Sequence, residues 1–208
     1  MTTEQALVKT LDFQLDIQSD NESLLYDACL EARSVYNETI RLANEGVEWD
    51  AIPDRVADDA KLVKNTTQRV VAKALGGMEN YYEYDDFGQP SHTKDGAYPL
   101  RANYEEGYNL SLTDDGDLAF RISAKPYKHV KGVLDGDDAH LDILKTALES
   151  DEWKIGTAEA LFHNENAELH VNVTNTEQTV RDKHDSRTVV GVDVNEDNVA
   201  LTALSENG

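Results

Sequence analysis

The spacing of apolar residues changes twice along this chain, and these two changes constrain its fold more than any other feature. Residues 6–17 alternate between apolar and polar positions, which predicts a strand with one buried face. Residues 19–46 follow a helical spacing instead, and the alternation returns at residue 108. A helical segment that interrupts a run of strands predicts an α+β fold.

The helical part is expected to contain three helices. Asp20 or Asn21 can cap the first helix, and Gly46 can end it. A second helical region is predicted from about residue 53 to 82, as two helices that meet near residues 64 and 65. The adjacent pair Gly76 and Gly77 disfavours helix near its end.

The second half of the chain predicts several strands. Residues 85–107 are rich in Gly and Pro and predict a loop, and an Asp-Gly turn predicts a hairpin over residues 108–122. Further strands are expected at 127–134, 153–162 and 167–174, with a short helix at about 137–149. Residues 1–17 and 97–176 thus predict a barrel-like β-rich domain, residues 18–96 a helical insertion, 177–187 a linker, and 188–208 the start of a further domain.

The net charge of −22, from 41 acidic and 19 basic residues, has three explanations. A disordered acidic chain is disfavoured by the periodic apolar segments, and a binder of basic partners by the dispersal of the acidic residues. We expect the third, a surface adapted to molar salt as in halophiles. At such salt the Debye length falls to about 3 Å, so the negative charge does not exclude a nucleic-acid partner.

Cysteine content and hydropathy exclude several classes of protein. The single cysteine, Cys29, excludes an internal disulfide and a zinc site built on paired cysteines. The sequence contains no apolar run of about 18 residues and no basic-then-apolar leader. We therefore expect a cytoplasmic protein with no membrane partner.

Two windows of the sequence contain basic residues and no acidic ones, which an even dispersal of charge does not predict. Residues 60–78 and 118–134 are these windows. The residues that we interpret as contacts to nucleic-acid phosphates are Lys61, Lys64, Arg69, Lys73, Arg121, Lys125, Lys128 and Lys131, with Tyr127 available for base stacking and Arg101 as a weaker candidate. The alternative is that these basic faces pack against acidic faces within the fold.

Asp193 is an acidic residue within the most apolar strand that the sequence predicts, residues 189–194. Burial of a carboxylate costs several kcal/mol unless a partner compensates its charge. A divalent cation can do so, and ribonuclease-H-like nucleases place an Asp on their first strand in a two-metal site. The alternative is an Asp at the solvent end of an ordinary hairpin.

Several segments resemble one family. Residues 191–195, GVDVN, followed by NVALTAL, resemble the opening of the RuvC-like nuclease domain of TnpB/OrfB-type transposon proteins, although Asn195 stands where Gly is usual. Residues 33–40, RSVYNETI, resemble the family's Ala-Arg-x-x-x-Asn segment. The helix of residues 64–75, in which Gln68 begins an amphipathic run, and the β-rich part at 120–132 follow in the family's order.

The resemblance implies an RNA-guided DNA endonuclease of the transposase family. Its fold would be a wedge-like or OB-like barrel with a helical recognition insertion, then the first hairpin of a truncated RuvC-like domain at 188–208. It implies that the basic residues and Gln68 bind guide RNA and target DNA, and that Asp193 is a catalytic Mg²⁺ ligand. Because the family's later Glu and Asp and its four-cysteine zinc ribbon are absent, we expect a catalytically incomplete N-terminal part. The alternatives are a non-catalytic nucleic-acid-binding module and an unrelated acidic halophilic α+β protein.

Overall fold

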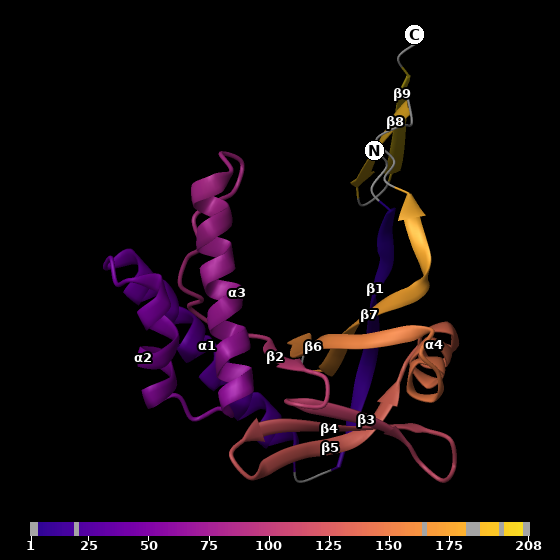
Figure 1. The fold of residues 1–208 in the computed structure, drawn as a ribbon, viewed down its shortest axis with the longest axis horizontal. Helices are drawn as coiled ribbons and strands as arrows, with labels where there is room; N and C mark the ends of the chain where they lie inside the picture. Colours follow the sequence, from indigo (N-terminus) through magenta and orange to yellow (C-terminus); the bar gives the residue numbers. More distant parts are fainter. Residues whose placement is uncertain (1–3, 19–20, 164–165, 182–187, 196–197, 206–208) are drawn as a thin grey trace.

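The computed structural model describes residues 4–18, 21–163, 166–181, 188–195 and 198–205. It confirms the α+β class: a curled antiparallel sheet of seven strands forms a half-barrel, accompanied by four α-helices (Figure 1). The helical insertion separates the first strand of this sheet from the other six, as the change in apolar spacing predicts.

The strands of the half-barrel are ordered β2-β6-β7-β1-β5-β4-β3, and every neighbouring pair is antiparallel. Their bounds are β1 Glu4–Ile17, β2 Leu100–Asn103, β3 Tyr108–Leu112, β4 Leu118–Lys125, β5 Lys128–Asp135, β6 Trp153–His163 and β7 Asn166–Arg181. In β1 the alternation buries Leu11, Phe13 and Leu15 on the concave face, while the residues between them are exposed. Pairing of β1 with both β5 and β7 places it at the centre of the sheet.

The loop between β2 and β3 connects the two edges of the sheet. The Tyr104 N–H donates to the Gly156 carbonyl on β6 (3.2 Å), and the Ser123 N–H on β4 donates to the Gly107 carbonyl (2.8 Å). The Tyr108 hydroxyl also donates to the Gly156 carbonyl, at 2.9 Å. These bonds hold the edges near each other at one end, which gives the sheet its curl.

Four α-helices and one short 3₁₀ helix complete the fold: α1 Glu22–Asn44, η1 Trp49–Ala51, α2 Ile52–Asp59, α3 Lys64–Glu83 and α4 Asp138–Glu149. The helix α1 buries small residues such as Ala28 and Cys29, and the Cys29 thiol lies 3.7 Å from the Ala160 carbonyl on β6. Burial raises the pKa of Cys29 to about 12, so its thiol is a core group and not a nucleophile. The helix α3 continues through Gly76 and Gly77 without interruption.

The segment that follows α3 packs back onto α1. The Asn37 side chain donates to the Thr93 carbonyl (2.9 Å) and accepts from the Thr93 N–H (2.8 Å), while Arg33 donates to the Gly96 carbonyl (2.8 Å). Tyr98 stacks on Tyr36 with ring centroids 4.4 Å apart. The Arg and Asn of the RSVYNETI segment therefore fix a loop to a helix in this structure.

The C-terminal strands form a sheet of their own. The strands β8 (Thr188–Asn195) and β9 (Asn198–Ser205) pair as an antiparallel hairpin, with Asp193 opposite Ala200. The strand β7 continues to Arg181, whereas the sequence predicts a linker from residue 177; residues 182–187 lie outside the described residues. Within the part of the chain that the structure describes, no helix is long and apolar enough to cross a membrane.

Candidate nucleic-acid interface

The outer face of the β4–β5 hairpin carries two cations side by side, and neither forms an ion pair with an acidic residue in the described part of the chain. Arg121 on β4 lies directly opposite Lys131 on β5, and both side chains are exposed. The neighbouring positions Phe120 and Ile122 are buried on the concave face, so alternation directs Arg121 outward. Directly opposed residues have Cβ atoms about 5 Å apart, and like charges at this distance repel each other. An anion bound between them would relieve that repulsion.

His129 lies beside this pair of cations. It is opposite Ser123 on β4, and its Nδ1 lies 3.3 Å from the Ser123 hydroxyl oxygen. Its pKa is lowered from the ordinary value, first by desolvation and then by the positive charges of Arg121 and Lys131. The pKa of His129 therefore depends on the charges of Arg121 and Lys131.

The tip of the same hairpin presents an aromatic ring to solvent. Lys125 pairs with Lys128, and the turn between them consists of Pro126 and Tyr127. Tyr127 has φ of 63° and is 100% exposed. A positive φ at the second central residue of a turn favours Gly or Asn, and an L-residue with a bulky side chain pays about 1–2 kcal/mol there. A strained and fully exposed tyrosine in a tight turn is a candidate functional residue.

Lys125 does not join Arg121 and Lys131 on the outer face. The strand register shifts between Ser123 and Lys125, and the Lys125 ammonium lies 3.7 Å from the Asp27 carboxylate on α1. The Lys125 side chain is only 26% exposed, whereas Lys128 is exposed at the tip. The second basic window is thus divided between the outer face, the tip and a contact with α1.

A shallow hollow of about 510 Å³ lies beside the outer-face cations. Arg121 and Lys131 line it together with Asn109 and Ser111 on β3 and Gln18, which follows the end of β1. The cations supply charge, and the amide and hydroxyl groups can donate hydrogen bonds to phosphate or sugar oxygens. This chemistry fits a nucleic-acid backbone.

The first basic window is also divided. Lys61, Lys64 and Gln68 are exposed where α3 begins, and the Lys61 N–H donates to Glu31 on α1 (2.9 Å). Arg69 is half-buried, and its Nε has no hydrogen-bond partner within the described residues. Lys61, Lys64 and Gln68 are therefore the members of this window that solvent and a ligand can reach.

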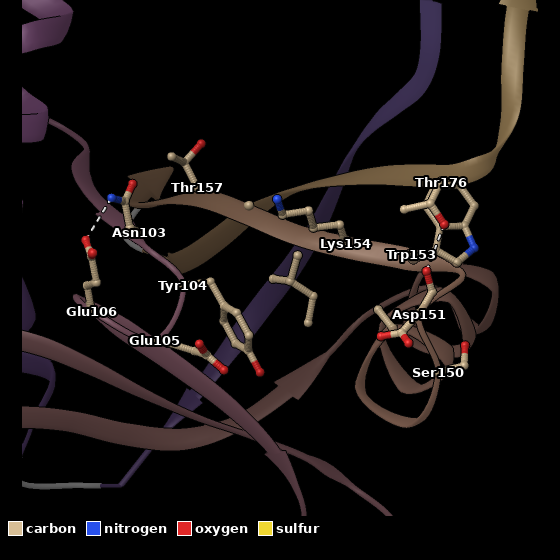
Figure 2. Close-up of a pocket in the computed structure, with 13 residues that line it drawn as sticks. Asn103, Tyr104, Glu105, Glu106, Ser150, Asp151, Trp153, Lys154, Thr157 and Thr176 are labelled. Atoms are coloured by element: carbon tan, nitrogen blue, oxygen red, sulfur yellow. Dashed lines mark hydrogen bonds between the residues drawn. The ribbon is translucent and has the colours of Figure 1, made fainter.

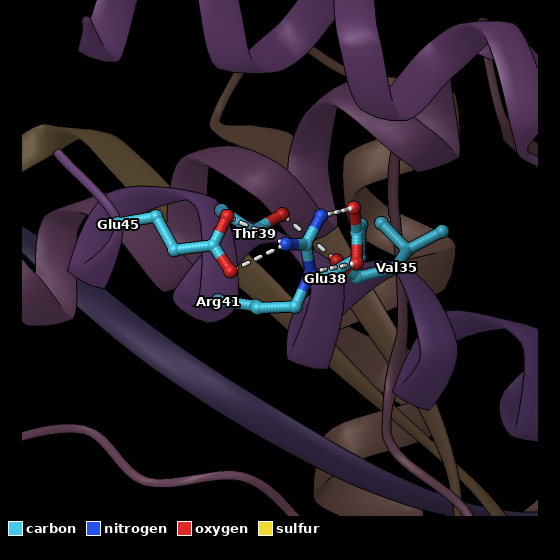
Figure 3. A network of polar contacts seen from close by, with 5 residues as sticks. All are labelled: Val35, Glu38, Thr39, Arg41 and Glu45. Carbon is cyan, nitrogen blue, oxygen red and sulfur yellow. Dashed lines mark hydrogen bonds and ion pairs between the residues drawn. The ribbon is translucent and has the colours of Figure 1, made fainter. Parts of the chain in front are cut away.

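Lys73 and Arg101 lie together but contact an acidic residue of the fold. The Lys73 ammonium lies 2.7 Å from Glu159 Oε1 on β6, and the Arg101 guanidinium 3.5 Å from the same oxygen. Arg41 on α1 is held in a comparable way by Glu38 and Glu45 (Figure 3). For Lys73 and Arg101 the geometry corresponds to the alternative in which basic residues pack against acidic ones.

A larger hollow, about 780 Å³, lies between the β2–β3 loop and the start of β6, and none of the residues predicted from the sequence lines it. Figure 2 shows Tyr104 and Glu105 on one side and Trp153 and Asp151 on the other. Glu105 has φ of 65°. No sequence pattern indicates this hollow, because the loop and β6 meet only through the strand pairing.

Asp193, the predicted Mg²⁺ ligand, lies on β8, but its side chain is outside the description that the structure gives. Among the residues whose side chains are described, no group of three or more His, Cys, Asp or Glu could hold a metal ion. The Mg²⁺ site therefore stays a prediction. Comparison of the chain with models of known protein families and with curated proteins finds no match in either case.

Proposed function

We propose that this chain is a nucleic-acid-binding module, in which the β4–β5 hairpin contacts a single strand of RNA. The observation that carries the proposal is the combination of Arg121 opposite Lys131 on the outer face with a fully exposed Tyr127 at the tip of the same hairpin. Phosphate contacts and base stacking are the two interactions by which proteins bind single strands without reading sequence.

In this proposal each group has a separate role. Arg121 and Lys131 contact phosphates, since an anion between them removes the repulsion of two like charges. Tyr127 stacks on a base, and the Pro126 ring limits the motion of the turn that presents it. Lys128, exposed next to Tyr127, contacts the phosphate of the stacked nucleotide.

The test is a titration of a labelled single-stranded RNA at several salt concentrations. The double variant Arg121→Glu/Lys131→Glu is expected to lose most of the affinity, and the slope of log affinity against log salt is expected to fall by about 0.7 for each phosphate contact removed. Tyr127→Ser is expected to weaken binding by about 1–3 kcal/mol with little change in that slope.

The matched control is Lys94→Glu/Lys154→Glu, which changes two exposed lysines outside the hairpin by the same total charge. If both double variants weaken binding equally, net charge alone governs it and the proposal is wrong. If Tyr127→Ser binds RNA as tightly as the wild type, Tyr127 does not stack on a base.

A second candidate function is the N-terminal part of a transposon-associated RNA-guided DNA endonuclease, with a wedge-like barrel and the opening of a RuvC-like domain. What supports it is the order of the elements: one strand, a helical insertion, the remaining strands, and a hairpin with Asp193 on its first strand. Binding of guide RNA and target DNA would then use the same basic residues.

The test of the second candidate is Mg²⁺-dependent cleavage of DNA with guide RNA supplied. Cleavage that Asp193→Ala abolishes would support the endonuclease. RNA binding without cleavage at any Mg²⁺ concentration would leave this chain as a binding module alone.

A further inference from the structure

The end of α3 carries a group of aromatic side chains that the proposed function does not use. Residues 81–87 read YYEYDDF, with four aromatic and three acidic residues. The helix ends at Glu83, and the chain then turns, with the Phe87 N–H donating to the Tyr84 carbonyl at 3.2 Å. We call the group formed by Trp49, Tyr81, Tyr82, Tyr84 and Phe87 the α3-end cluster.

The rings of the α3-end cluster form two contacting groups, and three of the five side chains are exposed to solvent. Ring centroids lie 6.2 Å apart for Trp49 and Tyr82, 5.2 Å for Tyr81 and Tyr82, and 5.8 Å for Tyr84 and Phe87. Tyr82, Tyr84 and Phe87 are 65%, 54% and 52% exposed. Exposed aromatic rings grouped at one helix end are typical of an interaction surface, because single exposed apolar residues are common but grouped ones are not.

The position of the α3-end cluster leaves it uncovered. The helix α3 extends away from the sheet, and its C-terminal end lies far from the β4–β5 hairpin (Figure 1). A helix of this length spans about 30 Å, so the basic residues Lys61 and Lys64 at its start are separated from the cluster by that distance. The two ends of α3 therefore present different chemistry to different ligands.

The charge around the rings indicates what the cluster can bind. Glu83, Asp85 and Asp86 alternate with the aromatic residues and are exposed, and the sequence contains no Lys or Arg between Lys73 and Lys94. Phosphates would find carboxylates and no cation to pair with, which disfavours nucleic acid here. A guanidinium group fits both features, since it stacks on aromatic faces and donates two parallel N–H hydrogen bonds to a carboxylate.

We propose that the α3-end cluster is a docking surface for an arginine-containing segment of a partner protein. Arginine is favoured over lysine because the lysine ammonium is compact and strongly hydrated, whereas the planar guanidinium loses less on stacking. Aromatic residues and arginine are also the side chains most enriched at the centres of protein interfaces.

The experiment measures binding of a labelled short peptide of alternating Arg and Gly to the full chain, by fluorescence anisotropy at fixed salt. The Arg peptide is expected to bind more tightly than a matched Lys-Gly peptide. The variant Tyr82→Ser/Tyr84→Ser/Phe87→Ser is expected to lower the affinity about tenfold or more. The control Tyr127→Ser removes another exposed tyrosine and is expected to leave the affinity unchanged.

A second variant separates docking from folding. Glu83→Gln/Asp85→Asn/Asp86→Asn keeps every ring and is also expected to weaken peptide binding, without lowering the thermal unfolding midpoint. Equal affinity of the triple Ser variant and the wild type would overturn the proposal. Two other results would also overturn it. If the wild type forms a dimer in sedimentation and the triple Ser variant does not, the cluster binds a second copy of the chain. If the triple Ser variant loses RNA binding, the cluster binds nucleic acid.

Discussion

His129 lies on the outer face of β5 beside Arg121 and Lys131, so its protonation adds a third positive charge to that face. Desolvation and then those two cations lower its pKa from 6.5 in the folded chain. The unfolded chain therefore binds more protons near pH 6, and the free energy of unfolding is expected to fall as the pH drops below about 6.5. Chemical denaturation at several pH values checks this, and His129→Gln is expected to remove this part of the pH dependence.

The same pKa reports on ligand binding. Phosphates that neutralise Arg121 and Lys131 are expected to raise the pKa of His129, and Arg121→Gln/Lys131→Gln is expected to raise it without a ligand. NMR titration of the His129 ring signal with and without RNA measures both shifts. A pKa that RNA leaves unchanged would place the ligand away from this face.

Glu159 is the partner of both Lys73 and Arg101. Glu159→Gln removes the charge that neutralises them and is expected to lower the free energy of unfolding by about 1 kcal/mol, because partly exposed ion pairs contribute less than the roughly 1.5–3 kcal/mol of buried hydrogen bonds to charged groups. Thermal and urea unfolding measure the change. RNA affinity is expected to rise slightly, since two cations are released, and a large loss of affinity would contradict the assignment of Glu159 to the fold.

At the scale of the elements, adding a Cβ at Gly132 or at Gly76 is expected to have opposite effects on stability. A Cβ on Gly132 in β5 would lie 1.9 Å from the Asp16 carbonyl oxygen on β1, whereas a Cβ on Gly76 in α3 would meet nothing within 4 Å. Gly132→Ala is expected to destabilise the fold by about 3 kcal/mol or more, and Gly76→Ala to stabilise it by about 0.5–1 kcal/mol. Urea unfolding of both variants measures these changes, and equal effects would contradict the strand packing.

Elements with a clear apolar period could be predicted, and those defined by distant partners could not. The alternation in β1 and the helical stripe in α1 are local signals, and both elements form as expected. The four residues of β2 lie in a segment rich in Gly and Pro, and pairing with β6 makes them a strand. Gly76 and Gly77 do not end α3, because buried neighbours such as Val71 and Met78 stabilise the helix.

The same limit applies to the candidate interface. The sequence could indicate two windows of basic residues. Which of these residues are exposed, and which pair with acidic residues of the fold, depends on contacts between distant segments. Glu159 is 86 residues from Lys73 along the chain, and the register shift in β4 that directs Lys125 toward Asp27 has no sequence signal. Arg121, Tyr127 and Lys131 are on an exposed face because of ordinary strand alternation and the turn, which are local.

At the scale of the whole molecule, the two proposed binding surfaces lie in different parts of the fold. The half-barrel presents the β4–β5 hairpin, and the helical insertion carries the α3-end cluster at the far end of α3 (Figure 1). A nucleic acid on the hairpin and a protein segment on the cluster could therefore bind at the same time. Both surfaces belong to a chain with a net charge of −22.

The net charge of −22 leads to opposite salt dependences of stability and of RNA binding. Repulsion among the carboxylates opposes the compact state, and raising the salt from about 0.1 M to 1 M shortens the Debye length from about 10 Å to 3 Å. The thermal unfolding midpoint is therefore expected to rise with NaCl, and equally with choline chloride if screening is the cause. RNA affinity in the same solutions is expected to fall, because phosphate contacts release counterions. A midpoint that falls with salt would mean that attractive ion pairs, such as those of Glu159, outweigh the repulsion.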